Sequence, residues 1–361
     1  MLSSVYKYVE LSPRARGKKS RLLVKSDYDA MLGAENIQTI LRRFEGTPYG
    51  SYISSAMLGE IDILSIEDSL MKSYEADLTF FVSQLKDQNA INFLREFSNS
   101  LRQRCIAQIL KSIILGIPWE TASAFVNPYG KIDAATCKSL VEGKNVKNSL
   151  KLMADKLLAG KVGDLVKEVV NPTKQALEVE QTVIAYTATK EWEKAERLKG
   201  RDRQCKQLLG ITFDMTNIMT VLRMKKLDFK LEEIERYSIP AYYKISEKTF
   251  KKAAAVATEK DAIKIFTSGY YVNVIAPLLS TYEVNEDLSI FETAFKRYHA
   301  QECEKIFFQN FFHLTEILAY LYLKLYEVRD LTAILIAKHL GLPADKTERQ
   351  LVLHQPPHPL S

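Results

Sequence analysis

The sequence predicts an all-α protein made of three similar helical domains. Glycine and proline are scarce, at 14 and 11 of 361 residues. No stretch of useful length alternates apolar and polar residues as a half-buried strand would. Helically spaced apolar positions, in contrast, recur three times at a period of about 113 residues. We therefore expect function to follow from the arrangement of three domains and not from one catalytic pocket.

The repeat is visible in three amphipathic helices per copy, whose apolar residues keep the i, i+3, i+4 and i+7 spacing of one helix face. The positions that recur are Ile37, Leu150 and Ile263 in the first helix, Ile66, Val179 and Phe291 in the second, and Ile106, Ile218 and Leu331 in the third. The steps are 112 or 113 residues. A unit of this length matches the commonest domain size and is too long for an ordinary solenoid repeat.

The joints between copies set the predicted domain boundaries. The segments 127–133 and 239–246 each contain a proline followed by a residue that caps helices, Asp133 or Ser246,. The predicted units are an N-terminal arm at 1–21, repeats at 22–132, 133–245 and 246–353, and a flexible, proline-containing tail at 354–361. Three like domains favour a pseudo-threefold ring around an axial cavity, with an open arc as the alternative.

Turn residues recur with the repeat. Gly116-Ile117-Pro118 in the first copy reappears as Gly341-Leu342-Pro343 in the third, where a glycine followed by proline ends a helix sharply,. The second copy has Asp228-Phe229-Lys230 at this place. Because it lacks the glycine, we expect its turn to be less sharply set.

Several classes of protein are disfavoured. Four scattered cysteines, Cys105, Cys137, Cys205 and Cys303, form no disulfide framework or zinc motif,. No apolar run reaches the length of a membrane span, and the N-terminus does not resemble a signal peptide,. Phosphate-loop, dinucleotide, hydrolase and metalloprotease motifs are missing. A net charge of +6 is too small for a nucleic-acid footprint,. We expect neither catalysis nor a cofactor or metal.

Polar residues in the third helix of the repeat are the candidate site. Their i, i+3 spacing stacks acid and amide groups beside the apolar stripe, and bases follow them. The candidates for contact with a partner are Asp214, Asn217, Arg223, Lys225, Glu327, Asp330 and Lys338. One interpretation is that they are favourable charges at helix ends. The other is that they line a polar cavity or docking surface. The first copy has Arg102 and Cys105 at the matching positions.

Two further clusters have alternative interpretations. The arm carries five bases between Arg14 and Arg21, which either meet phosphate or acidic lipid or form a solvated helix flank,. Phe307, Phe308, Phe311 and Phe312 are too dense for one helix face. Part of this cluster should pack between domains or against a partner, although core packing alone remains the alternative.

The chain resembles the family of central-stalk C subunits of archaeal and bacterial V/A-type rotary ATPases, whose counterpart in the eukaryotic vacuolar enzyme is the d subunit. The resemblance covers almost the whole length and rests on the triple repeat and on the order of several short motifs. These are Arg14-Ala15-Arg16, Thr47-Pro48-Tyr49-Gly50, the run from Asp214 and Asn217 to Arg223, and Lys338-His339-Leu340-Gly341-Leu342.

The resemblance implies a funnel-shaped, non-catalytic peripheral membrane protein at the cytoplasmic face of the cell membrane. Its implied partners are the membrane rotor ring, which it caps, and the central shaft, which its cavity seats. Torque would then pass between ring and shaft in a complex that translocates protons or sodium ions. The mild basic surplus also suits an anionic lipid surface near the ring. The alternatives are a helical scaffold that does not rotate and a lipid- or nucleic-acid-binding module that uses the arm.

Overall fold

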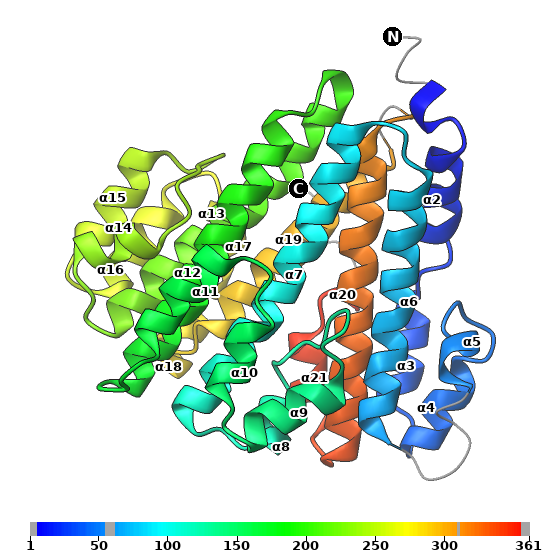
Figure 1. The fold of residues 1–361 in the computed structure, drawn as a ribbon, viewed down its shortest axis with the longest axis horizontal. Coiled ribbons are helices and arrows are strands. Elements are labelled where there is room, and N and C mark those ends of the chain that lie inside the picture. Colours follow the sequence, from blue (N-terminus) through cyan, green and yellow to red (C-terminus); the bar gives the residue numbers. More distant parts are fainter. Residues whose placement is uncertain (1–5, 55–61, 309–310, 355–361) are drawn as a thin grey trace.

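The computed structural model describes residues 6–54, 62–308 and 311–354, and every regular element in these ranges is a helix. Tyr129 and Ile132 form an isolated β-bridge at the joint between the first two copies. The prediction of an all-α protein is confirmed. Figure 1 shows long helices running obliquely through the molecule, with shorter helices around their ends.

Each copy contributes two long helices. They are α6 (Ile63–Gln84) and α7 (Gln88–Leu115), α12 (Pro172–Glu196) and α13 (Cys205–Lys226), and α19 (Ser289–Ile306) and α20 (Leu314–His339). Polar N-caps start three of them, since Asp62, Asp87 and Asn171 each accept a hydrogen bond from a backbone N–H of the first turn,. The second and third helices predicted in each copy are these pairs.

The second long helix of each copy ends in the same way. In each copy a backbone N–H donates to the carbonyl five residues earlier, the 6→1 bond of a Schellman motif. The bonds join Ile117 N to Ser112 O, Phe229 N to Met224 O and Leu342 N to Ala337 O. Gly116 and Gly341 have φ values of 64° and 65°, as the predicted turns require. The expected looser turn in the second copy is wrong, because Asp228 adopts φ 58° and closes the same motif. Aspartate tolerates this conformation better than most residues.

Short helices precede and follow each long pair. Before it lie α3 (Lys25–Leu32), α4 (Ile37–Arg43) and α5 (Gly50–Ile53); α9 (Ala134–Glu142), α10 (Val146–Lys151) and α11 (Lys156–Leu165); and α15 (Glu247–Ala255), α16 (Glu259–Thr267), α17 (Val272–Ile275), η2 (Ala276–Leu278) and α18 (Leu279–Asn285). After it lie α8 (Trp119–Ala122), α14 (Leu231–Tyr237) and α21 (Ala344–Gln350). The remaining elements are α2 (Leu11–Lys19) and η1 (Gly200–Gln204).

The six long helices contact one another in a closed order. Within each copy, the two long helices pack together. Between copies, α7 packs along α12, α13 packs on α19, and α20 packs on α6. Figure 1 shows α7 and α12 side by side, and α20 beside α6. The contacts therefore run from the first copy to the second, on to the third, and back to the first.

The buried apolar side chains form two clusters that cross the predicted boundaries. One cluster joins the arm and most of the first copy to the second copy as far as the first half of α13, and to the end of α19 and α20 of the third. The other joins α13 to the short helices and α19 of the third copy. Helix α20 is buried along nearly its whole length. The copies thus share their cores, and the boundaries at 132/133 and 245/246 stay predictions.

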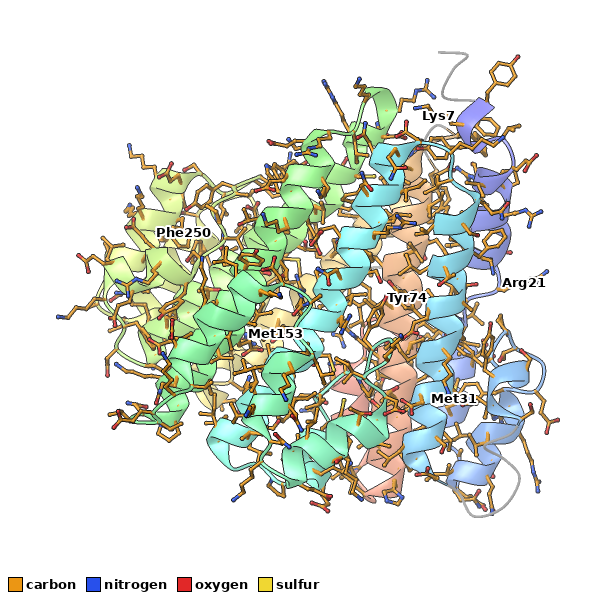
Figure 2. All side chains as sticks on the ribbon, viewed as in Figure 1. Lys7, Arg21, Met31, Tyr74, Met153 and Phe250 are labelled. Atoms are coloured by element: carbon orange, nitrogen blue, oxygen red, sulfur yellow. The ribbon has the colours of Figure 1, made fainter. Side chains whose placement is uncertain are left out.

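The predicted arm is packed against the body. Helix α2 lies along α20, and its bases Arg16, Lys18 and Lys19 pair with Glu316, Asp77 and Glu304 at 2.5, 2.5 and 2.6 Å. Arg21 extends away from the body (Figure 2). At the other end, His354 is buried and its Nε2 lies 2.6 Å from Asp29 Oδ1. The rest of the predicted tail, 355–361, lies outside the described residues.

Candidate functional site

Asp214 is fully buried in the middle of α13, where it accepts hydrogen bonds from the joint that follows the second copy. The backbone N–H groups of Tyr243, Lys244 and Ile245 donate to its carboxylate at 2.9, 2.6 and 3.1 Å. The hydroxyl of Tyr271 donates to Oδ2 at 3.0 Å. Burial raises the pKa of Asp214, and these four hydrogen bonds oppose the rise,. The carboxylate organises a loop and leaves no oxygen at the surface.

Asn217 in the second copy and Asp330 in the third each accept a hydrogen bond from the backbone N–H of the residue 22 positions later. Ile239 N donates to Asn217 Oδ1 at 2.8 Å, and the side-chain amide donates back to Ile239 O at 3.0 Å. Val352 N donates to Asp330 Oδ1 at 2.9 Å. Burial raises the pKa of Asp330 to about 7, against the effect of its backbone donors. The two side chains perform the same task one repeat apart.

Glu327 joins the third copy to the first. Leu23 N donates to Oε2 at 2.6 Å, and the hydroxyl of Tyr49 donates to Oε1 at 2.5 Å. The carboxyl is fully buried, and burial raises its pKa. Lys324 Nζ lies 3.8 Å from Oε1 and 3.6 Å from the centre of the Tyr49 ring. Burial lowers the pKa of Lys324 to about 8.

The partners of Glu327 are the repeat equivalents of the partners of Asp214. Tyr271 and Tyr49 are 222 positions apart, and so are Ile245 and Leu23. The first residues of α16 and α4, Glu259 and Ile37, have the same separation, so the structural equivalence here is four positions shorter than the predicted 226 between Ile37 and Ile263. In each case a carboxylate on the second long helix accepts one tyrosine hydroxyl and one backbone N–H. Glu327 therefore accepts counterparts of two of the four hydrogen bonds of Asp214, and the bonds from Tyr243 N and Lys244 N have no counterpart among the bonds of Glu327 described above.

The first copy makes its junction differently. The guanidinium of Arg102 donates from Nη2 to Leu152 O of the second copy at 2.8 Å. Cys105 Sγ lies 3.7 Å from Cys137 Sγ, and both thiols are buried. Gln108, one turn later, accepts from Asn127 N at 2.9 Å and so holds the following joint. Arg102 and Cys105 therefore still contact the second copy, although they are a base and a thiol where the other copies have acid or amide groups.

The bases among the candidates lie at the helix ends. Arg223 pairs with Glu292 and is half-buried, and Lys225 is buried, which lowers its pKa. Lys338 Nζ donates to Leu32 O of the first copy at 3.3 Å. The end-charge interpretation is right for these bases, which lie in the last turns. It is wrong for the acids, because Asp214 and Glu327 lie in the middle of their helices.

Sequence reasoning missed the partners of the acids. Gln108, Tyr49 and Tyr271 were not among the expected site residues, and the 222 positions between the two tyrosines do not match the predicted 226 between Ile37 and Ile263. Their rings are buried, so periodicity counts them only as core residues. The structure thus gathers Asp214 and Asn217 around one joint and Glu327 around another. Contact of these residues with a partner protein stays a prediction.

The aromatic cluster and the arm meet each other. The Arg16 guanidinium lies 3.9 Å from the centre of the Phe311 ring. Lys19 Nζ lies 5.9 Å from the Phe307 ring, and Phe308 is exposed. Part of the cluster therefore packs outside a single helix core, against α2. Three of the five bases between Arg14 and Arg21 are paired, so Arg14 and Arg21 are the unpaired exposed charges of this run within the described residues.

Two absences concern the described residues alone. They contain no group of three or more histidine, cysteine, aspartate or glutamate side chains placed to hold a metal ion. None of the helices in this part of the chain has both the length and the apolar character that crossing a bilayer requires.

Comparison with known proteins identifies the family of the chain. The model of the ATP synthase (C/AC39) subunit family matches residues 11–350. The C subunit of the A-type ATP synthase of Methanocaldococcus jannaschii is 20% identical over 359 residues, covering 98% of this chain and 88% of the relative. That of Methanobrevibacter smithii is 19% identical, covering 96% and 88%, and that of Pyrococcus furiosus is 23% identical, covering 92% and 87%. The chain therefore belongs to the ATP synthase (C/AC39) subunit family.

Proposed function

We propose that this chain is a non-catalytic central-stalk component of a V/A-type rotary ATP synthase or ATPase, which joins the membrane rotor ring to the central shaft and transmits torque. The observation that carries the proposal is the closed order of the six long helices. The related C subunits of A-type ATP synthases supply the complex in which this role belongs.

A closed order of helices suits the transmission of torque. Torque shears the junctions between domains, and an open arc would yield at its two free ends. Here, Glu327 bonds the last copy to Leu23 and Tyr49 of the first, where no covalent link crosses. Densely packed helices resist compression and transmit strain. We propose a pseudo-threefold, funnel-like body that binds the ring at one end and seats the shaft in its axis.

Six of the seven candidate residues, all but the buried Lys225, divide between two tasks under this proposal. Asp214, Asn217, Glu327 and Asp330 act from inside, because they fix the joints and thus the relative placement of the copies. Arg223 and Lys338 are half-buried and lie near the ends of α13 and α20. We assign direct contact with partner proteins to these helix ends. The location that follows is the cytoplasmic face of the cell membrane, held there through the ring.

Co-purification tests assembly. A tagged chain should be recovered from detergent-solubilised membranes together with the proteolipid ring, the shaft and the catalytic head. A chain that associates with none of them, even when all components are co-expressed, contradicts the proposal. Dissociation of the head at high salt should leave the chain on the ring, since the proposed position is next to the membrane.

Cross-linking separates a rotor component from a non-rotating scaffold, the second candidate function. Engineered cysteines should link the chain either to a protein of the ring or to a protein of the stationary peripheral stalk. If the chain rotates with the ring, the first link leaves ATP hydrolysis coupled to ion transport, whereas the second stops both. The opposite pattern identifies a stationary scaffold. Reduction of the cross-link should restore activity in either case and serves as the control.

A further inference from the structure

A basic surface distinguishes the second copy from the other two. Residues 143–161 contain the five lysines Lys144, Lys147, Lys151, Lys156 and Lys161 and one acid, Asp155. The segments one period away, 30–48 and 256–274, each contain two bases and two acids. The fold is shared, so the excess is not needed to build these short helices. Most of the chain's net charge of +6 lies in this one segment.

All five of these lysines are exposed and make no ion pair in the described chain, and Lys161 Nζ also lies 5.7 Å from the centre of the Tyr186 ring. Lys147 and Lys151 are one turn apart on α10, opposite the fully buried Ser149,. Lys144 precedes this helix, and Lys156 begins α11. We call Lys144, Lys147, Lys151 and Lys156 the lysine patch. Asp155 pairs with none of these lysines; it accepts from Leu157 N, Leu158 N and the Tyr186 hydroxyl at 2.9, 3.1 and 2.5 Å and offsets one of the positive charges.

An exposed leucine accompanies the lysine patch, and the segment that carries the patch contains no aromatic residue. Leu157, next to Lys156, is 62% exposed. Met153, labelled in Figure 2, is buried between α10 and α11 and anchors the connection that carries the patch. Segment 143–161 contains no aromatic residue on which a nucleic-acid base would stack,. It also contains no arginine, the base that protein interfaces favour while they deplete lysine,.

We propose that the lysine patch docks on the headgroups of anionic phospholipids. Flexible lysines attract a diffuse layer of phosphate without fixed geometry, and an exposed leucine adds contact with the acyl boundary. The proposal rests on the rotary function proposed above for its place in the cell. There, a fluid lipid surface has a mechanical advantage: it has no register, so a rotating patch slides over it, whereas a fixed protein partner would act as a brake.

Vesicle co-sedimentation of the isolated full chain tests the patch. The chain should bind vesicles of phosphatidylcholine mixed with phosphatidylglycerol, and bind poorly to phosphatidylcholine alone. Changing Lys144, Lys147, Lys151 and Lys156 together to glutamine should weaken binding to the anionic vesicles by about tenfold or more at low salt. Rising salt should weaken wild-type binding steeply and the variant's binding little.

A matched control removes the same charge elsewhere. Lys230, Lys248, Lys252 and Lys346 are also exposed and unpaired in the described chain. Changing all four to glutamine should lower the logarithm of the binding constant for anionic vesicles by less than half of the decrease that the patch variant shows. Equal losses in both variants overturn the proposal, because net charge alone would then explain binding. Circular dichroism should show unchanged helix content in both variants.

Two further outcomes overturn the proposal. Absence of wild-type binding to anionic vesicles at low salt excludes a lipid surface. Tighter binding of the patch to duplex DNA than to anionic vesicles assigns it to nucleic acid instead. Neither outcome touches the rotary function, since co-purification with the ring is measured separately. Conversely, a chain that binds vesicles but never assembles with a ring supports the patch and contradicts the function.

Discussion

The hydroxyl of Tyr49 donates a 2.5 Å hydrogen bond to Glu327 Oε1 across 278 positions of the sequence. Both residues are fully buried. This bond joins the first copy to the third, at the junction that the chain itself does not cross. Because Glu327 also accepts from Leu23 N, two segments of the first copy depend on one carboxylate.

Removal of the Tyr49 hydroxyl should weaken this junction. In Tyr49→Phe the buried Glu327 loses a donor while the aromatic ring remains, so the cost is that of an unsatisfied polar group. We expect the free energy of unfolding to fall by about 1–3 kcal/mol. Urea unfolding followed by circular dichroism measures it through the shift of the midpoint at constant slope.

Tyr52→Phe is the matched control. Tyr52 lies in α5, the short helix whose N-cap is Tyr49, and it is half-buried; its hydroxyl makes no hydrogen bond within the described residues. Its change should alter the free energy of unfolding by less than about 0.5 kcal/mol. If the two variants unfold at the same midpoint, the Tyr49 hydroxyl does not support the junction.

Asp214 should matter more for folding than for direct contact with a partner. Asp214→Asn replaces one acceptor oxygen by a donor and leaves backbone N–H groups of the joint unpaired. We expect a loss of about 2–3 kcal/mol in the free energy of unfolding. Arg223→Gln, which removes a half-exposed ion pair on the same helix, should cost less than about 1 kcal/mol,. A larger loss for Arg223→Gln would reverse our assignment of the two residues.

Helical periodicity predicted the parts of the fold that depend on neighbouring residues. The long pairs α6–α7, α12–α13 and α19–α20 follow from apolar spacing, and their ends follow from capping residues. The turn at Asp228 was misjudged because its left-handed conformation depends on the backbone bond between Phe229 and Met224. The closed order of contacts was one of two open alternatives, since packing between distant helices leaves no local pattern.

The candidate site was located by spacing, but the role of its acids was not. The i, i+3 positions of Asp214 and Asn217 place polar groups beside the apolar stripe, which suits a surface equally well. The segment 239–246 determines that these side chains are buried, because it packs over them and its Ile239 N and Ile245 N donate hydrogen bonds to them. That packing is a tertiary event. The predicted register offered no clue, because Tyr49 and Tyr271 are 222 positions apart and the predicted repeat places equivalent residues 226 apart.

Glu67 should make stability depend on pH. It is buried in α6 with Oε2 unpaired, and burial raises its pKa from an ordinary 4.5 to about 8. Between these values the folded chain holds a proton that the unfolded chain has released, so stability falls as pH rises. Glu67→Gln should gain about 1–2 kcal/mol of stability relative to wild type between about pH 6 and about pH 8.

The difference between variant and wild type is the quantity to follow. Glu191 and Asp330, whose burial raises their pKa values to about 7, add slopes of the same sign in both proteins. His299, whose burial lowers its pKa to about 3, adds a slope of the opposite sign in both at lower pH. Subtraction removes all three. Glu120→Gln, at an exposed position, should give a flat difference, and a flat difference for Glu67→Gln would show that Glu67 is ionised in the fold.

Gly210 gives Tyr243 the room to cover α13. A Cβ atom at Gly210 would lie 2.5 Å from Tyr243 Cγ, and Tyr243 N is one of the donors to Asp214. Gly210→Ala should therefore displace the ring and lower the free energy of unfolding by about 1–3 kcal/mol. Gly160→Ala in α11 meets no atom within 4 Å and should leave stability unchanged or raise it by up to about 1 kcal/mol,.

A double-mutant cycle separates this clash from a general effect of alanine. Tyr243→Ala removes the ring and keeps the backbone donor to Asp214. In that background, Gly210→Ala has nothing to displace, so it should cost less than it does in the wild-type chain by about 1 kcal/mol or more. Thermal unfolding of the four proteins gives the coupling. Additive losses would mean that Gly210 serves α13 for a reason other than the Tyr243 ring.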